Sequence, residues 1–158
     1  MKSHRVAVDA MGGDYAPEEI IIGCIKALKE NNDISILLVG EQERILKELE
    51  LFNYDPQRLQ VVHASEVIKM TETPLAALRR KHDTSILIST QLVAEGKASA
   101  LVTAGSSGAA MATAILYLKR MEGVDRPAMA ILFPTLRGFS IILDVGANVD
   151  CSAQHLAQ

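Results

Sequence analysis

Short runs of apolar, often β-branched residues alternate with segments of helical periodicity along most of this chain. The apolar runs predict strands at residues 5–9, 34–39, 59–63, 100–104, 128–133 and 139–143. The intervening segments predict helices near residues 17–28, 41–51, 74–81, 84–95 and 108–120. Strands that alternate with helices favour an α/β fold of three layers, in which a mainly parallel sheet carries helices on both faces.

The last two predicted strands depart from this alternation. Only residues 134–138 separate them, and this connection is too short for a parallel crossover. We therefore expect an antiparallel hairpin at strands 5 and 6. The apolar run 139–143 also predicts that its strand is buried.

Length and composition restrict the class of protein. With 158 residues, 49% apolar and 22% charged, the chain is expected to form a single globular α/β domain. A net charge of −3 and few aromatic residues argue against nucleic acid as a partner. Cys24 and Cys151 have no zinc-binding spacing, and the apolar stretch 108–118 is too short to span a bilayer. With no signal peptide at its start, the sequence indicates a cytoplasmic protein.

Two glycine-containing loops each follow a predicted strand and precede a helix. The first contains Gly12 and Gly13 and leads to Pro17, a residue favoured at helix starts. The second is Gly105-Ser106-Ser107-Gly108. Such loops can approach a ligand closely and direct backbone N–H groups at an anion, so both are candidate phosphate sites. An ordinary turn in the first loop, and close packing of strand against helix in the second, are the alternatives.

A polar loop, residues 144–151, follows the last strand and precedes a helical pattern. Asp144, Asn148 and Asp150 are suited to binding a cation, orienting a nucleophile or capping the next helix. Cys151, near the helix start, is a candidate nucleophile, although a structural cysteine is the commoner case. His155 lies one turn later.

Other polar residues carry weaker signals. The basic run Arg79-Arg80-Lys81 could hold phosphate, but a solvated charged face is the favoured interpretation. His63, at the end of a strand, could transfer protons or be structural. Glu41 lies where dinucleotide-binding folds place a ribose-binding acid, but the first loop lacks the glycine pattern of those folds.

Several blocks together are more specific than any one loop. Residues 8–18, 63–70, 126–128 and 144–151 resemble, in the same order, the signature blocks of the PlsX family of bacterial phosphate acyltransferases. The resemblance extends from Arg5 to Gln158. It implies a fold similar to the isopropylmalate dehydrogenase group. It also implies formation of acyl phosphate from acyl-acyl carrier protein and inorganic phosphate, for phospholipid synthesis.

The resemblance further implies a homodimer that uses no metal and no organic cofactor, and a downstream membrane acyltransferase that acylates glycerol 3-phosphate. A cytoplasmic protein with a peripheral membrane contact would fit this role. In the second glycine loop the family has Ala-Gly-Asn-Thr-Gly, whereas this chain has Ser106 and Ser107. Because family members are roughly twice as long, we expect an amino-terminal half of a larger protein.

From these observations we predict that Gly12 and Gly13, with Gly105, Ser106, Ser107 and Gly108, bind phosphate and the reaction oxyanion. Asp14, Asn148 and Asp150 are the candidates for catalysis or for ordering the site. Two alternatives stay open: a noncatalytic fragment that serves assembly or binding, and a nucleotide-binding relative of the dehydrogenases.

Overall fold

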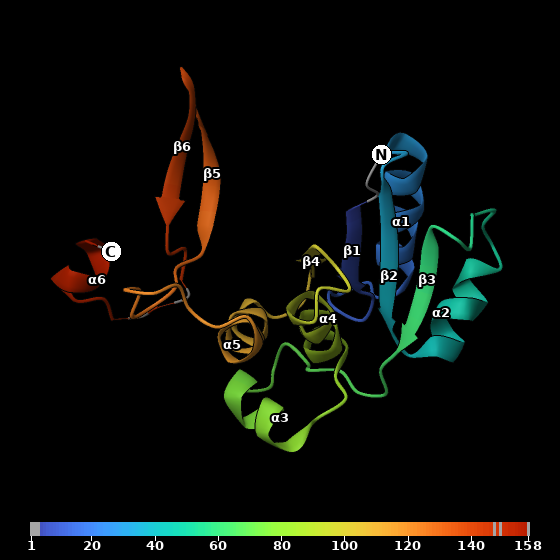
Figure 1. Cartoon of the computed structure of the whole chain (residues 1–158), viewed down its shortest axis with the longest axis horizontal. Coiled ribbons are helices and arrows are strands. Elements are labelled where there is room, and N and C mark those ends of the chain that lie inside the picture. Colours follow the sequence, from blue (N-terminus) through green and yellow to red (C-terminus); the bar gives the residue numbers. More distant parts are fainter. Residues whose placement is uncertain (1–3, 147, 149, 158) are drawn as a thin grey trace. The chain divides into compact units, whose positions relative to one another are not determined.

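The computed structural model describes residues 4–146, 148 and 150–157. The chain divides into two compact units, Met1–Leu118 and Lys119–Gln158, and each is described by itself. The first unit contains a parallel sheet in the order β3-β2-β1-β4, and the second contains the two-stranded sheet β5-β6 (Figure 1). The predicted α/β architecture is therefore confirmed. The single-domain assignment stays a prediction.

The strands of the parallel sheet are β1 (His4–Asp9), β2 (Ile34–Gly40), β3 (Leu59–His63) and β4 (Ala100–Val102). Helices α1 (Glu18–Glu30), α2 (Gln42–Leu49), α3 (Pro74–Arg80), α4 (Ser85–Ala94) and α5 (Ser107–Tyr117) complete the first unit. Each lies within a few residues of its predicted position. β1 is central and pairs in parallel with both β2 and β4.

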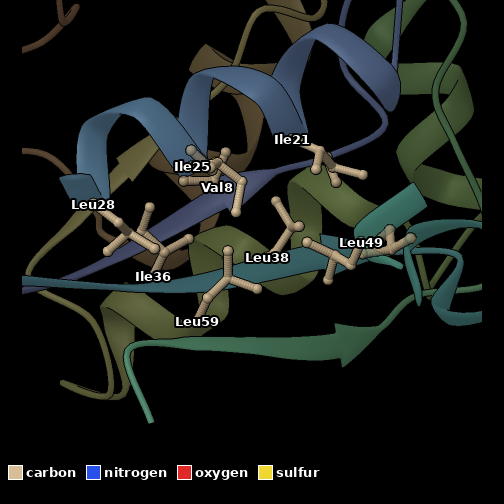
Figure 2. Packing of buried hydrophobic residues seen from close by; sticks show 11 residues of the cluster. Val8, Ile21, Ile25, Leu28, Ile36, Leu38, Leu49 and Leu59 are labelled. Atoms are coloured by element: carbon tan, nitrogen blue, oxygen red, sulfur yellow. The ribbon is translucent and has the colours of Figure 1, made fainter. Parts of the chain in front are cut away.

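Successive side chains of β1 and β2 point to opposite faces of the sheet, and helices cover both faces. Val8 packs with Ile36 and Leu38 against α1 and α2, and this cluster forms the largest part of the core (Figure 2). Residues of opposite parity, Ala7 and Leu37, face the other side of the sheet, where residues of α4 cover them. Because successive strand side chains point to opposite faces, a sheet covered on both sides needs apolar residues at every position of its central strands.

A second layer of helices packs beyond α4. Ile86 and Leu87 of α4 share a cluster with Ala109 and Ala112 of α5. The buried hydroxyls of Thr90 and Thr113 lie 3.0 Å apart at this contact. This arrangement fixes the start of α5 relative to α4 and hence relative to the sheet.

The second unit holds β5 (Ala130–Thr135), β6 (Gly138–Leu143) and α6 (Ala153–Ala157). The strands pair antiparallel, with Ala130 opposite Leu143, so the predicted hairpin is confirmed. The predicted burial of the strand at 139–143 is wrong: every residue of β5 and β6 is exposed. An apolar strand indicates a surface that is buried by some contact, but its sequence does not indicate which element or partner makes that contact.

Candidate functional site

The two glycine loops of the sequence prediction meet at one edge of the parallel sheet. Val6, Ala7 and Val8 of β1 pair with Ala100, Leu101 and Val102 of β4. Because these neighbouring strands are parallel, the loops that follow them leave the sheet side by side. This edge, at the carboxyl ends of the strands, is where open α/β sheets bind ligands.

A buried carboxylate joins the two loops. Asp9, at the end of β1, is 3% exposed. Its Oδ1 accepts the Met11 N–H at 3.1 Å, and its Oδ2 accepts the Thr103 hydroxyl at 2.8 Å. Thr103 Oγ1 in turn accepts the Gly105 N–H at 3.0 Å. One chain of hydrogen bonds thus runs from the first loop, through Asp9, to the second.

The glycines allow this close approach. A Cβ on Gly12 would lie 2.6 Å from Asp9 Oδ2 and 2.8 Å from the backbone nitrogen of Gly105, both impossible distances. A Cβ on Gly105 would lie 3.1 Å from the Gly12 Cα. Gly13 has a φ of +115°, a conformation that side chains rarely adopt. Gly105 in the second loop thus serves close packing of loop against loop, rather than the packing of strand against helix that was the alternative, and this contact is compatible with a ligand site beside the same atoms.

The start of α5 opens beside this contact. Ser106 is the N-cap, and its hydroxyl accepts the Ala109 N–H at 3.3 Å. Ser107 and Gly108 follow in the first turn and are exposed. A Cβ on Gly108 would lie 2.9 Å from Cγ of Pro74, so α3 approaches the helix start closely. The N-terminus of a helix has unpaired N–H groups and the positive end of the helix dipole, both of which favour anions.

A small cavity lies at the meeting of the loops. Its volume, about 10 Å³, holds roughly one water-sized group. Its polar and backbone lining comes from Asp9, Gly12, Ser85, Gly105 and Ser106. Its apolar lining comes from Val67, Ile68, Ile86 and Ala109. The cavity therefore brings together the end of β1, the loops after β1 and β4, the starts of α4 and α5, and the segment before α3.

The sequence block 63–70 is held against the start of α4 by two carboxylates. Asp83 Oδ2 accepts the Ser65 hydroxyl at 2.6 Å and the Ser65 N–H at 2.8 Å. Glu66 Oε2 accepts the N–H groups of His82 and Asp83 at 3.1 and 3.2 Å. The bonds from Ser65, with a smaller contribution from the charge of His63, lower the pKa of Asp83. This reciprocal pairing, here called the 65–83 clasp, places Val67 and Ile68 beside the cavity.

The basic run is divided in the structure. Lys81 Nζ donates to Glu72 Oε2 at 2.7 Å and to the Val67 carbonyl at 2.6 Å, so it supports the same segment as the clasp. The hydrogen bond from Lys81 is the main cause of the lowered pKa of Glu72. Arg79 and Arg80 are exposed, as the solvated-face interpretation predicts.

His63 and Glu41 lie together at the start of α2. His63 Nδ1 accepts the Gln42 N–H at 3.4 Å, which in the neutral ring places the proton on Nε2. Glu41 is the exposed N-cap residue of the same helix. These contacts support a structural role for His63.

The residues after β6 lie in the second unit. Asn148 donates its backbone N–H to Asp144 and its side-chain amide to the Pro127 carbonyl, at 3.1 Å in each case. The Asp150 carbonyl accepts from Arg126 at 2.6 Å. The bonds to Pro127 and from Arg126 tie this loop to the segment before β5. A hollow of about 210 Å³ beside them includes Cys151 and His155 in its lining.

The cysteines show little sign of nucleophilic chemistry. Cys151 Sγ lies 3.7 Å from Asp144 Oδ2, and a neighbouring carboxylate disfavours the anionic thiolate that a nucleophile requires. Burial raises the pKa of the Cys24 thiol to about 12. Within the described residues, no group of three or more His, Cys, Asp or Glu side chains is arranged to hold a metal ion.

The sequence pattern predicted the glycines and serines of this site, but it did not predict Asp9, Thr103 or Ser85 as site residues. A signal for Asp9 was present, because it directly follows the apolar residues 6–8. Thr103 becomes notable only when β4 is known to pair with β1, since 94 positions separate it from Asp9. Asp14, the remaining candidate of the first loop, is exposed.

Comparison with known families gives the site its context. The model of the family described as "Fatty acid synthesis protein" matches residues 4–158. The chain belongs to this family. It is the PlsX family that the sequence blocks resemble, so that prediction is confirmed.

The family contains curated relatives with high identity. The phosphate acyltransferase of Syntrophomonas wolfei is 50% identical over 155 residues, which is 98% of this chain and 48% of that protein. The phosphate acyltransferase of Dictyoglomus turgidum is 48% identical over the same share of this chain and 46% of its own length. The chain thus spans about half the length of the curated relatives it matches.

Solved structures extend the likeness of the fold. A phosphotransacetylase from Streptococcus pyogenes superposes with a TM-score of 0.68 at 17% identity, over 99% of this chain and 51% of that one. The EutD phosphotransacetylase from Staphylococcus aureus gives 0.63 at 19% identity, over 99% and 50%. At such identities the likeness establishes the fold alone. Among the residues described, no helix has the length and apolar character needed to cross a membrane.

Proposed function

We propose that this chain forms part of a phosphate acyltransferase, which transfers an acyl group from acyl carrier protein to inorganic phosphate and so supplies phospholipid synthesis. The family and its phosphate acyltransferase relatives support the reaction class. The observation that carries the proposal is local: the Gly12 and Gly105 loops meet at the sheet edge beside the start of α5.

This geometry suits phosphate because both loops offer backbone N–H donors and carry no bulky side chain at their contact. Gly12 and Gly13 supply one loop, and the run from Gly105 to Gly108 supplies the other. The N–H groups of Ser107 and Gly108 lie in the first turn of α5, where the helix dipole adds a favourable positive potential. The same donors would stabilise the oxyanion that forms when the thioester carbonyl is attacked.

The reaction needs little covalent help from the protein. A phosphate oxygen attacks the thioester carbon, a C–O bond forms and the C–S bond breaks. The proton that the phosphate carried ends on the leaving sulfur, so acyl phosphate and free carrier thiol are the products. Catalysis then depends on positioning and electrostatics, and no metal or organic cofactor enters the scheme.

The three polar candidates fit ordering roles. A carboxylate that receives no hydrogen bond from phosphate repels it, so Asp14, exposed after Gly13, and Asp150 are assigned to orienting loops or cations. Asn148 bonds through both its backbone N–H and its side-chain amide, which suits the same role. Ser106 stands where the family pattern has Asn, so the hydroxyl that caps α5 replaces an amide at that position.

The partners belong to the same proposal. The acyl donor is acyl carrier protein, the acceptor is inorganic phosphate, and the product passes to a membrane acyltransferase for glycerol 3-phosphate. The active form is a homodimer in the cytoplasm with a peripheral contact to the membrane. The strongly apolar α5, with Leu116 59% exposed, is consistent with an interface.

The substitution Ser107→Asp tests the phosphate site. An acidic residue in the first turn favours the helix, but it repels a bound anion by about 1–4 kcal/mol near contact. In the whole protein we expect the KM for phosphate to rise by about tenfold or more, with little change in thermal stability. Steady-state release of carrier thiol measures this.

Gln42→Asp is the matched control, because Gln42 is the exposed first residue of α2, at a different helix start. It should leave the KM for phosphate unchanged. If Ser107→Asp also leaves the KM unchanged, the start of α5 is not the phosphate site.

A second candidate function is assembly without catalysis. The exposed apolar hairpin, with Phe139 at 76% and Ile141 at 68% exposure, favours it. The chain would then bind a partner through this surface and release no carrier thiol. Thiol release by this chain, from acyl carrier protein thioester and phosphate, would exclude that function.

A further inference from the structure

The cavity between the glycine loops contains an acidic group where an anion is proposed to bind. Asp9 lines it, together with Gly12, Gly105 and Ser106. The Asp9 carboxylate is held at both oxygens, by Met11 N–H and by Thr103, and it is 3% exposed. It can neither rotate away nor gain much screening from water, so any bound anion must accommodate it.

The Asp9 carboxylate can accommodate an anion because it has unused positions for accepting hydrogen bonds. An ionised carboxylate offers about four lone-pair positions, and the hydrogen bonds just named use two of them. Gly12 has no side chain to cover Oδ2, which lies 2.6 Å from the position a Cβ would take. A group that reaches this carboxylate through the cavity is therefore bound only if it donates a hydrogen bond to it.

The size of the cavity limits what reaches it. A volume of about 10 Å³ accommodates roughly one oxygen atom, not a whole phosphate. A bare anionic oxygen there would be repelled, whereas a hydroxyl would make a short charge-assisted hydrogen bond. Inorganic phosphate keeps at least one proton near neutral pH, and sulfate, of the same shape, keeps none.

We propose that Asp9 is a specificity-determining residue, which accepts a hydrogen bond from the P–OH group of inorganic phosphate and thereby excludes fully deprotonated tetrahedral anions such as sulfate. The inference rests on the proposed function and names the protonation state of its acceptor substrate. Thr103 is the positioning residue of this arrangement, because its hydroxyl fixes Oδ2 and joins it to the second loop.

The test is anion selectivity in the whole protein, measured as the ratio of the inhibition constant of sulfate to the KM of phosphate. Asp9→Asn replaces an obligate acceptor with a group that can also donate. We expect sulfate to become a competitive inhibitor and the ratio to fall by about tenfold or more, as for the loss of a hydrogen bond to a charged group. An unchanged ratio would overturn the inference.

Two controls separate selectivity from loop damage. Thr103→Val removes the hydroxyl but leaves the carboxylate, which the Met11 N–H still holds at Oδ1, so both anions should weaken together and most of the ratio should persist. Asp83→Asn removes a carboxylate of the 65–83 clasp, which bonds Ser65, and should also leave the ratio unchanged. A fall of the ratio in either control, as large as in Asp9→Asn, would count against a specific role for Asp9.

A measurement on the unaltered protein covers the case in which Asp9→Asn does not fold. Arsenate keeps a proton near neutral pH, and selenate has a similar shape without one. We expect arsenate to compete with phosphate at least about tenfold better than selenate. Equal competition would refute the role of Asp9. Failure of Ser107→Asp to affect phosphate use would instead refute the placement of phosphate at the start of α5 in the proposed function.

Discussion

Gly12 faces a carboxylate oxygen and a backbone nitrogen, and neither can move without disturbing the loops that they hold. We expect Gly12→Ala to lower the free energy of unfolding by about 1–3 kcal/mol, as overpacking does. The cause is the clash of the new Cβ, 2.8 Å from Gly105 N. Urea denaturation followed by circular dichroism measures the change.

Gly23 provides the matched control for this substitution. It lies inside α1, and apart from its neighbours in the same helix no atom lies within 4 Å of the position that a Cβ would take there. Gly23→Ala should raise stability by about 0.5–1 kcal/mol, since alanine favours helices. If the two substitutions change stability alike, the contact between the glycine loops is looser than these distances indicate. Activity loss in Gly12→Ala alone would not identify a phosphate ligand, because the clash explains it.

The 65–83 clasp and the Lys81–Glu72 ion pair make the segment before α3 sensitive to acid. The pKa values of Asp83 and Glu72 are lowered from 3.8 and 4.5 in the folded protein. A lowered carboxyl pKa means that the unfolded chain takes up protons first as the pH falls. Their stabilising contribution is therefore complete well above pH 4.5 and is lost as the pH falls through the lowered values.

Melting temperatures of the wild type and of an Asp83→Asn, Glu72→Gln variant, taken from about pH 7 to about pH 3, test this dependence. The variant should melt lower near neutral pH, and the difference should shrink toward the acid end, where the native carboxylates are also protonated. A difference that stays constant with pH would show that side-chain shape, rather than charge, supports the segment.

Elements that are determined by local sequence patterns could be predicted, whereas features that depend on contacts between distant segments could not. The strands β1 and β2 and the helix α1 follow from local apolar periodicity, and the hairpin follows from the short connection between β5 and β6. The burial of β6 could not be inferred correctly, because burial depends on a covering surface rather than on the strand itself. Likewise, the loops named from glycine and serine do meet, but the Asp9–Thr103 hydrogen bond that joins them depends on the pairing of β1 with β4.

The two units differ in what could stabilise them alone. The core clusters all lie within residues 1–118, and none of the described residues from 119 to 157 is buried. A two-stranded hairpin without a covered face is marginal in water. We expect a chain ending at Leu118 to unfold cooperatively, within a few degrees of the whole chain, and residues 119–158 alone to give a disordered circular dichroism spectrum.

A chain ending at Ser106 is the control for this truncation, because it also removes Ala109 and Ala112 of α5 from the core against α4. It should melt well below the chain ending at Leu118, since buried contacts are lost rather than exposed ones. If the chain ending at Leu118 instead loses its cooperative transition, residues 119–158 contribute to the stability of the sheet. The exposed apolar side chains of β5 and β6 would then be assigned to stabilising the fold of this chain. They would not be assigned to a surface that binds a partner.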